Sequence, residues 1–542
     1  MKVGIYDRYL ATMGGGERYA CKMAEVLSHS HEVDLISERL VDLRRVGEQL
    51  HIDLSRVSLK IFPYLSQEYA AYITKDYDLF VNATYLSSLS NLARRGIYLV
   101  YFPTPFDVDF KLKHRLAYLL LRGWAERINR EDTLQKILPA VGVEPVVGVY
   151  DPSRFLLGGY AWTCGQAVVR IKEGQGDRPL KLRIQAGRRR GVPPAQITVR
   201  ADGEVVLRDK SLTGKQRLDL VVPPALLVEG GEVEVVSSTF VPAQYGYSQD
   251  SRELGVVISY KTSLPLPGRL LLRCLSFIPL FVINYPRDLA FLDSYDRIIS
   301  ISQYTQSWVK KRWGRDSQIL YPPVEIDSLR DGPKREMVIS VGRFFTGNHN
   351  KKQLEMVRAF KEIYRKGKRG WEYHLVGGVE DIKEHRRYLQ QVRRESEGYP
   401  IYIHENASWE ELVRLLSQGK IFWHASGLGE NEDKHPDKFE HFGITTVEAM
   451  ASGCVPVVIA RGGQREIVQD QVDGFLFEDW PGLVETTVHL MEDQELLHKV
   501  GQKAREKSKK FSTQSFARHL EDVVAELQDS SPPERLGDLA GY

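Results

Sequence analysis

Residues 438–450 read KFEHFGITTVEAM, and they place two carboxylates, Glu440 and Glu448, on either side of a glycine turn at Gly443. The pattern after the turn predicts a helix. Because the first N–H groups of a helix lack partners within it and the helix dipole adds positive charge there, the turn suits a phosphate. Carboxylates beside it would accept hydrogen bonds from sugar hydroxyls. The stretch therefore predicts a site for a nucleotide sugar, which has hydroxyls at both ends and phosphate between them.

Length and charge narrow the class of protein. A chain of 542 residues exceeds one hydrophobic core and predicts about three or four domains. The net charge of +3 gives a weak electrostatic case for a nucleic-acid partner. Four cysteines without a CxxC pair argue against a zinc site or a disulfide framework and favour a reducing compartment. We find no secretory signal pattern and no apolar run of membrane-spanning length, so we expect a cytoplasmic protein.

The N-terminal part predicts a nucleotide-binding α/β unit. The apolar run Val3–Tyr6 leads into the loop Gly14-Gly15-Gly16 and then into apolar residues at helical spacing. Such a glycine loop lets the backbone approach a ligand closely, although a tight turn without a ligand has the same pattern. The alternation of strand-like runs with helical or loop segments predicts a parallel sheet with helices on both faces. The further runs are Glu32–Ile36, Val57–Phe62, Asp78–Asn82 and Ile97–Phe102.

Residues from about 148 to 263 follow a different pattern. Leu180, Leu182 and Ile184 alternate with charged residues, and turn signals recur through the region. Short alternating strands with hardly a helical stretch predict a β-sandwich inserted into the first α/β domain. We expect its aromatic residues in the sandwich core, with stacking on sugar rings as the alternative. These residues are Tyr160, Trp162, Phe240, Tyr245 and Tyr247.

A second α/β pattern begins with the apolar run from Met337 to Val341. Strand-like runs separated by helical segments predict a second open parallel sheet. The runs are Tyr373–Val376, Ile401–His404, Ile421–His424, Val455–Ile459 and Gly474–Phe477.

Two basic residues belong to this second domain. Arg343 follows its first strand, and Lys351 follows a flexible loop. A guanidinium and an ammonium group aimed into one crevice would neutralise a diphosphate and stabilise it as a leaving group. The alternative for each residue is a surface charge. On the first interpretation no metal and no other cofactor is expected.

As a set, these motifs resemble the retaining GT-B glycosyltransferases of family 4. The resemblance covers nearly all of the chain apart from the inserted region and the tail, and its second-domain motifs are specific together, whereas the spacing from Glu440 to Glu448 alone is a weak signal. The other segments that carry it are Gly14–Glu17, Val341-Gly342-Arg343 with Lys351, His424–Gly427, Ala451–Val457 and Gly462–Ile467.

The resemblance implies an α/β fold of the GT-B class, in which two Rossmann-like domains face a cleft, here with an all-β sandwich inserted in the N-terminal domain. The N-terminal acceptor domain would comprise residues 1–147 and 264–330, with the sandwich at 148–263. The nucleotide-sugar domain would comprise 331–511, followed by a helix at 512–528 that crosses back to the N-terminal domain. Residues 529–542 are expected to form a disordered tail.

The resemblance also implies roles for single residues. Glu440 would bind hydroxyls of the transferred sugar and help to hold the charge that develops at its anomeric carbon, while Glu448 would bind the ribose. Arg343 and Lys351 would bind the diphosphate. We therefore predict Glu440, Arg343 and Lys351 as catalytic residues, and Gly14, Gly15, Gly16, Gly443, Ile444, Thr445 and Glu448 as substrate-binding residues.

The implied activity is transfer of a hexose, with retention, from a UDP- or GDP-sugar to a hydroxyl of a glycan or lipid-linked saccharide in polysaccharide biosynthesis. One departure concerns Pro103, which stands where many members of the family have a histidine. Proline donates no side-chain hydrogen bond. A catalytically weak sugar-binding protein therefore stays an alternative, as does a GT-B nucleotide-sugar epimerase or hydrolase.

Two segments suggest peripheral contact with the inner face of the membrane. Lys111–Arg130 is amphipathic and basic, and Leu270–Tyr285 is a largely apolar run that contains Arg273. The alternatives are a solvated helix with one core face for the first segment and a buried helix for the second, and we favour the buried helix.

Overall fold

The computed structural model describes residues 1–38, 41–61, 71, 74–108, 112, 114–116, 118–119, 122–123, 143–150, 155, 159–171, 180–189, 191–223, 231–245, 252–260, 286, 288–330, 332–347 and 349–529. Leu270–Tyr285, most of Lys111–Arg130 and the tail after Asp529 lie outside these residues. The described chain forms two compact units. The first contains Met1–Tyr98 and Pro105–Asp296, and the second contains Leu99–Thr104 and Arg297–Ser531. The domain boundaries proposed from the sequence stay predictions.

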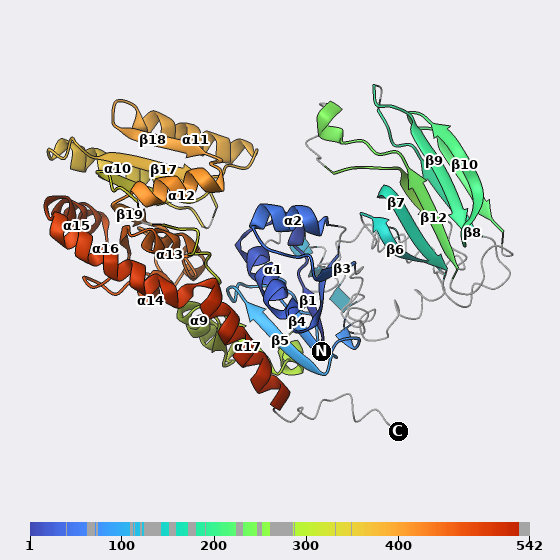
Figure 1. Cartoon of the computed structure of the whole chain (residues 1–542), viewed down its shortest axis with the longest axis horizontal. Coiled ribbons are helices and arrows are strands. Elements are labelled where there is room, and N and C mark those ends of the chain that lie inside the picture. Colours follow the sequence, from blue (N-terminus) through green and yellow to red (C-terminus); the bar gives the residue numbers. More distant parts are fainter. Residues whose placement is uncertain are drawn as a thin grey trace. The chain divides into compact units, whose positions relative to one another are not determined.

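A parallel sheet organises the N-terminal part of the chain (Figure 1). Its strands are β1 (Lys2–Tyr6), β2 (Glu32–Ser37), β3 (Val57–Ile61), β4 (Leu79–Asn82) and β5 (Arg95–Val100), followed much later by β14 (Arg297–Ser300) and β15 (Gln318–Ile319). The order is β15-β14-β5-β4-β1-β2-β3. Among the described residues of this part, α1 (Gly15–Ser28) follows β1 and α2 (Leu43–Leu50) follows β2, while α9 (Gln303–Trp313) lies between β14 and β15 in the chain. The predicted first parallel sheet is confirmed.

Burial explains why the inner strands of this sheet read as continuous apolar runs. All residues of β4 and β5 are buried, as expected for parallel strands that are covered on both faces. The one charged residue of β5, Arg95, forms an ion pair with Asp296 at 3.2 Å, and both side chains are less than one-tenth exposed. A buried charge needs such a partner, so this pair fixes the start of β5 within the first unit.

The region between the two α/β patterns is all-β. Its strands are β6 (Val143–Val149), β7 (Ala161–Ile171), β8 (Leu180–Gln185), β9 (Ala195–Ala201), β10 (Glu204–Leu212), β11 (Arg217–Val222), β12 (Glu232–Ser237) and β13 (Val257–Tyr260). All paired neighbours are antiparallel, in the order β10-β9-β12-β7-β13-β8-β11, with β6 beside β7.

The strand β7 joins the two halves of this sheet. Its residues Gln166–Arg170 pair with β12, whereas Ala161 and Trp162 pair with β13. The strands therefore form one continuous sheet instead of the two separate sheets of a sandwich. Their buried side chains form one apolar core. The expectation that the aromatic residues are core residues holds for Phe240, which is 6% exposed, and is wrong for Tyr160 and Tyr245, which are both 41% exposed. Tyr247 lies outside the described residues.

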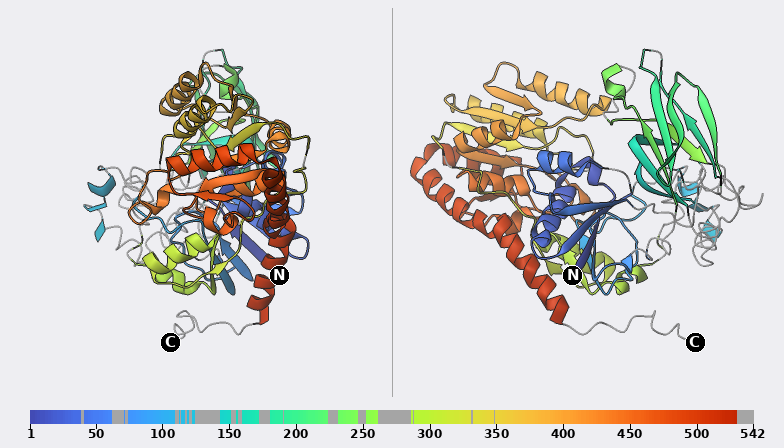
Figure 2. Two further views of the ribbon diagram at one scale, coloured as in Figure 1. Left: turned by 90° about the vertical axis from the view of Figure 1, so that its left-hand side faces the viewer. Right: turned by 45° about the vertical axis from the view of Figure 1, so that its right-hand side comes forward.

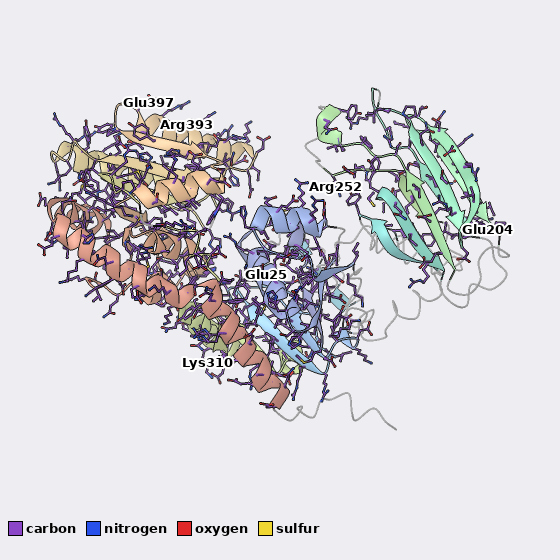
Figure 3. The ribbon with its side chains drawn as sticks, in the orientation of Figure 1. Glu25, Glu204, Arg252, Lys310, Arg393 and Glu397 are labelled. Carbon is purple, nitrogen blue, oxygen red and sulfur yellow. The ribbon has the colours of Figure 1, made fainter. Side chains whose placement is uncertain are left out.

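The second unit contains the second parallel sheet, with the order β18-β17-β16-β19-β20-β21. Its strands are β16 (Met337–Val341), β17 (Glu372–Gly377), β18 (Ile401–Glu405), β19 (Ile421–His424), β20 (Val455–Ile459) and β21 (Phe475–Phe477). The connecting helices are α10 (Gln353–Arg365), α11 (Lys383–Ser396), α12 (Trp409–Gln418), α13 (Ile444–Ala451) and α14 (Gln464–Ile467). Helices flank this sheet in both views of Figure 2, and Figure 3 shows Arg393 of α11 and the adjacent Glu397 on the exposed side.

The strand order reverses between β16 and β19. From β16 the chain proceeds to β17 and β18 on one side, and from β19 to β20 and β21 on the other. In open α/β sheets, ligands bind in the crevice at the carboxyl ends of the strands at such a switch point. The fold therefore predicts a ligand site beside the residues that follow Val341 and beside His424.

Three helices end the described chain: α15 (Trp480–Glu492), α16 (Gln494–Ser508) and α17 (Thr513–Asp529). Short 3-10 turns are η1 (Leu10–Thr12), η3 (Pro242–Tyr245), η4 (Ala290–Ser294), η5 (Pro436–Lys438) and η6 (Lys509–Phe511). In the part of the chain that the structure describes, no helix combines the length and the apolar character that a membrane span requires.

Candidate functional site

Three side chains of the second unit converge where β16 and β19 end. The Lys351 ammonium group forms an ion pair with Oε2 of Glu440, and His424 Nε2 donates a hydrogen bond to the same oxygen at 2.9 Å. The His424 side chain is 3% exposed, whereas those of Lys351 and Glu440 are 22% and 23% exposed. The carboxylate is thus held from the protein side and remains accessible from solvent.

Glycines make this convergence possible. A Cβ atom at Gly342, directly after β16, would lie 2.7 Å from Cγ of Lys351, so the lysine stem passes over bare backbone. Gly462 has a φ of +61°, which glycine adopts readily, and a Cβ there would lie 2.5 Å from the carbonyl oxygen of Glu440. That carbonyl accepts a hydrogen bond from the N–H of Gly463 at 2.8 Å. The backbone of Glu440 is therefore fixed by the glycine turn before α14.

The charges at this site are set by their neighbours. Burial of Glu440 would raise the pKa of its carboxyl group, but the Lys351 ammonium and the His424 hydrogen bond more than offset this and hold that pKa well below its usual range. Burial lowers the pKa of His424. At neutral pH the cluster therefore contains one cation, one anion and a neutral imidazole whose Nε2–H donates a hydrogen bond to Glu440.

The hydrogen bonds leave capacity for a ligand. Both protein bonds to Glu440 go to Oε2, and Oε1 accepts none from any described residue. Among the described residues, the Lys351 ammonium group donates one hydrogen bond, to Glu440, so two of its three N–H donors are available for a ligand. A carboxylate oxygen suited to a sugar hydroxyl thus lies beside an ammonium group suited to a phosphate.

The glycine turn opens α13 as predicted. Gly443 precedes the helix with a φ of +129°, and a Cβ there would lie 2.5 Å from Nε2 of Gln464. Among the described residues, the backbone N–H groups of Gly443, Ile444 and Thr445 have no hydrogen-bond partner, as expected at a helix start without a side-chain cap. Glu448 lies in the second turn and is 4% exposed. Its predicted contact with ribose stays a prediction.

Arg343 is not brought into contact with this cluster. Its guanidinium lies 3.3 Å from Glu380 and packs over the ring of Phe345, and its side chain is 65% exposed. An exposed pair of this kind contributes little, so the arginine is able to exchange Glu380 for another anion at small cost. The structure places Lys351 beside Glu440 and Arg343 beside Glu380, and the predicted contacts of both residues with a diphosphate stay predictions.

The glycine loop of the first unit has its own feature. Helix α1 begins at Gly15 after Gly14, and the N–H of Gly14 donates to Oε2 of Glu17 at 2.6 Å. A carboxylate of the chain therefore already satisfies one donor at this helix start. The predicted ligand contacts of Gly14, Gly15 and Gly16 stay predictions.

Several residues near Glu440 carry no role in the sequence analysis. His441 stacks on Phe102 with ring centroids 4.0 Å apart, and its ring meets that of His349 edge-on at 5.0 Å. Burial lowers the pKa of both histidines, so they flank Glu440 as neutral aromatic rings. His424 was quoted as part of a motif without a function. Its position as the last residue of β19, at the carboxyl end of a strand, is the signal that identifies it.

Comparison with known families supports the same region. Residues 324–507 match the family model of glycosyl transferases group 1. This part of the chain is similar to members of that family. The match contains Lys351, His424, Glu440 and the start of α13.

Curated relatives match about the same share of the chain. A Dictyostelium discoideum protein described as GDP-Man:Man(3)GlcNAc(2)-PP-Dol alpha-1,2-mannosyltransferase is 28% identical over 237 residues, which is 41% of this chain and 45% of the relative. The alpha-1,3/1,6-mannosyltransferase ALG2 of Mus musculus is 27% identical over 266 residues, 43% of this chain and 59% of the relative. The chain thus spans about half the length of the curated relatives that it matches.

Solved structures extend the likeness to the whole fold. A glycosyltransferase from Rickettsia africae has a TM-score of 0.51 at 12% identity, covering 98% of this chain and 99% of that one. The sucrose-phosphate synthase of Thermosynechococcus elongatus has a TM-score of 0.50 at 12% identity, covering 98% and 100%. At this identity the likeness concerns the fold alone, and it confirms the predicted GT-B class.

Proposed function

We propose that the protein is a retaining glycosyltransferase that moves a hexose from a nucleotide sugar to a hydroxyl of a lipid-linked saccharide, with GDP-mannose as the first donor to test. The observation that carries the proposal is the contact between Lys351 and Glu440 at the switch point of the second sheet. The donor and acceptor classes are suggested by the names of the relatives, which contain GDP-mannose and a lipid-linked saccharide.

The contact suits the chemistry of a nucleotide sugar. In such a donor the anomeric carbon is bonded through oxygen to the distal phosphate, so groups that bind phosphate and sugar have to be neighbours. As that bond breaks, negative charge grows on the leaving diphosphate and positive charge grows at the anomeric carbon. A cation and an anion fixed side by side would each lie near the charge that it stabilises.

The remaining groups complete the arrangement. The unpaired N–H groups at the start of α13 would add donors for the phosphate, and the neutral His424 would hold Glu440 in place without cancelling its charge. We propose that no metal takes part, because Lys351 and the start of α13 supply positive charge for a diphosphate. Arg343 would add to it, since its exposed pair with Glu380 is readily exchanged for another anion.

The test is nucleotide release from a panel of GDP- and UDP-sugars, with and without lipid-linked saccharide acceptors. Acceptor-dependent release with a glycosylated product supports the proposal. Release without acceptor would instead indicate a hydrolase, and a changed sugar without release an epimerase. Saturable donor binding without any turnover would indicate the sugar-binding alternative.

A lipid-linked acceptor would require work at a membrane surface, and we propose peripheral contact at the cytoplasmic side. Flotation with anionic liposomes measures this directly. Protein that remains at the bottom of the gradient at every salt concentration contradicts it.

A further inference from the structure

A second candidate site lies in the second unit, away from Glu440. Two neighbouring cavities of about 590 Å³ and about 580 Å³ share the side chains of Arg505 and Lys509 as lining residues. One extends along α16 to Lys334 and Gly453, and the other extends along η6 and α17 to Leu329. We call the two together the basic groove. Figure 1 shows α16 and α17 in succession at the C-terminal end of the described chain.

The groove concentrates positive charge. Six lysine and arginine side chains line it, against two carboxylates, Asp327 and Glu506. Its formal charge of +4 exceeds the +3 of the whole 542-residue chain. The basic residues are Arg330, Lys334, Lys420, Arg505, Lys509 and Arg518. Because the rest of the chain is nearly balanced, this concentration is a local feature of the groove.

Part of this charge is already engaged and part is exposed. Lys420 pairs with Glu336 at 2.6 Å, and Lys334 donates to the carbonyl of Ser452 at 2.5 Å. Among the described residues Lys509 pairs with Glu506 alone, a neighbour on the same turn, and both side chains are more than 60% exposed. Such an exposed pair is weak and is readily exchanged for a stronger anion.

Two glycines form the close packing beside the groove. Gly453, with a φ of +75°, and Gly501 both line it, and a Cβ at Gly501 would lie 2.8 Å from the carbonyl oxygen of Gly453. The loop after α13 therefore packs directly on the α16 backbone. The groove meets the C-terminal end of α13, whereas the candidate donor site meets its N-terminal end. Eight helical residues separate these ends by about 12 Å, so the groove is a separate site.

We propose that the basic groove binds a phosphate-bearing ligand, through Arg505 and Lys509 at the junction of the two cavities. Guanidinium and ammonium groups are the side chains that recognise phosphate, and Arg505 provides the planar donors for bidentate contact. The concave shape fits a compact phosphate group, either free or as a lipid headgroup. The site lies outside the machinery of the proposed transfer reaction and does not depend on it.

The sequence of α16 provides a matched control. His498, Gln502 and Arg505 line the groove at helical spacing, whereas Lys499 and Lys503 are exposed on another face of the same helix and do not line it. The test variant is Arg505→Gln with Lys509→Gln, and the control is Lys499→Gln with Lys503→Gln. Each double variant removes two positive charges near the C-terminal end of the chain. A difference in ligand binding between the two variants therefore depends on where the charges lie and not on the net charge.

The experiment is a calorimetric titration of inorganic pyrophosphate into the full chain, with a parallel sedimentation assay on phosphatidylglycerol vesicles. We expect the test variant to bind pyrophosphate at least about tenfold more weakly than wild type and the control to bind as wild type does. The subsite at Lys351 is intact in all three proteins, so its contribution cancels. Thermal unfolding of each variant verifies that it is folded.

The two arms separate the sources of phosphate. Loss of pyrophosphate binding in the test variant alone supports a site for a free phosphate compound. Loss of vesicle binding in the test variant alone, with equal pyrophosphate binding in all three proteins, supports a lipid headgroup. Equal losses in test and control variants, or no loss in either assay, overturn the proposal.

Discussion

Glu440→Gln separates the charge of the central carboxylate from its shape. The amide still accepts hydrogen bonds from Lys351 and His424, so one negative charge is the main loss. Exposed ion pairs contribute ~0.2–1 kcal/mol, and breaking a buried pair costs ~3–5 kcal/mol. With Lys351 22% and Glu440 23% exposed, we expect a loss of about 1–3 kcal/mol in the free energy of unfolding. The rate should suffer more: removing a preorganised charge at the reacting carbon lowers kcat about 10²–10³-fold.

The assay is steady-state nucleotide release with the donor that proves active, together with denaturant unfolding. Glu430→Gln is the matched control, because Glu430 is 24% exposed and also accepts from two cations, Lys352 at 3.0 Å and Lys438 at 2.8 Å. It should lose similar stability and keep its kcat. If Glu440→Gln retains the wild-type kcat, or if Glu430→Gln loses as much, then the carboxylate charge at Glu440 does not act on the chemical step.

Three further outcomes follow from the structure. Lys351→Met should raise the donor KM and lower kcat together, by about 10²-fold in kcat, because the leaving diphosphate gains charge in the transition state, while Lys352→Met should leave kcat unchanged in the same assay. Exhaustive dialysis against EDTA should leave the rate of nucleotide release unchanged, and a loss that Mg²⁺ restores would show that the cationic side chains are insufficient. Burial lowers the pKa of His374 to about 4, so the unfolded chain binds the proton more readily below pH ~6.5. The free energy of unfolding should therefore fall between pH ~6.5 and ~4, by up to about 3 kcal/mol, and His374→Gln should flatten that part of the profile measured by denaturant titration.

The parallel sheets could be predicted from the sequence because their strands are buried on both faces. Such strands are short unbroken apolar runs, and Ile421–His424 and Val455–Ile459 were predicted with the bounds that the structure shows. The inserted region was harder. Alternation identified β8 as a strand, but it does not indicate which strands pair, and the double pairing of β7 depends on contacts far apart in the sequence.

The site was predicted in part. Glycine turns and helix starts are local, so the opening of α13 after Gly443 followed from the sequence alone. The direction of a long side chain is not local. Arg343 and Lys351 have the same charge and both lie between β16 and α10, yet Lys351 contacts Glu440 across bare glycine, whereas Arg343 contacts Glu380 on the exposed surface. His424 was missed as a functional residue because a buried histidine at a strand end has the same sequence pattern as a core residue.

The pairing of Lys351 with Glu440 has a consequence for how a donor would enter. Both groups are half-buried and each is the other's ionic partner, so neither pays the penalty of an isolated buried charge. A nucleotide sugar would bring a phosphate to the lysine and a hydroxyl to the glutamate, replacing one satisfied pair by two satisfied contacts. His424 would keep its bond to Oε2 throughout, because it is almost fully buried and neutral. The carboxylate would therefore change partners without changing position, which is the preorganisation that charge stabilisation requires.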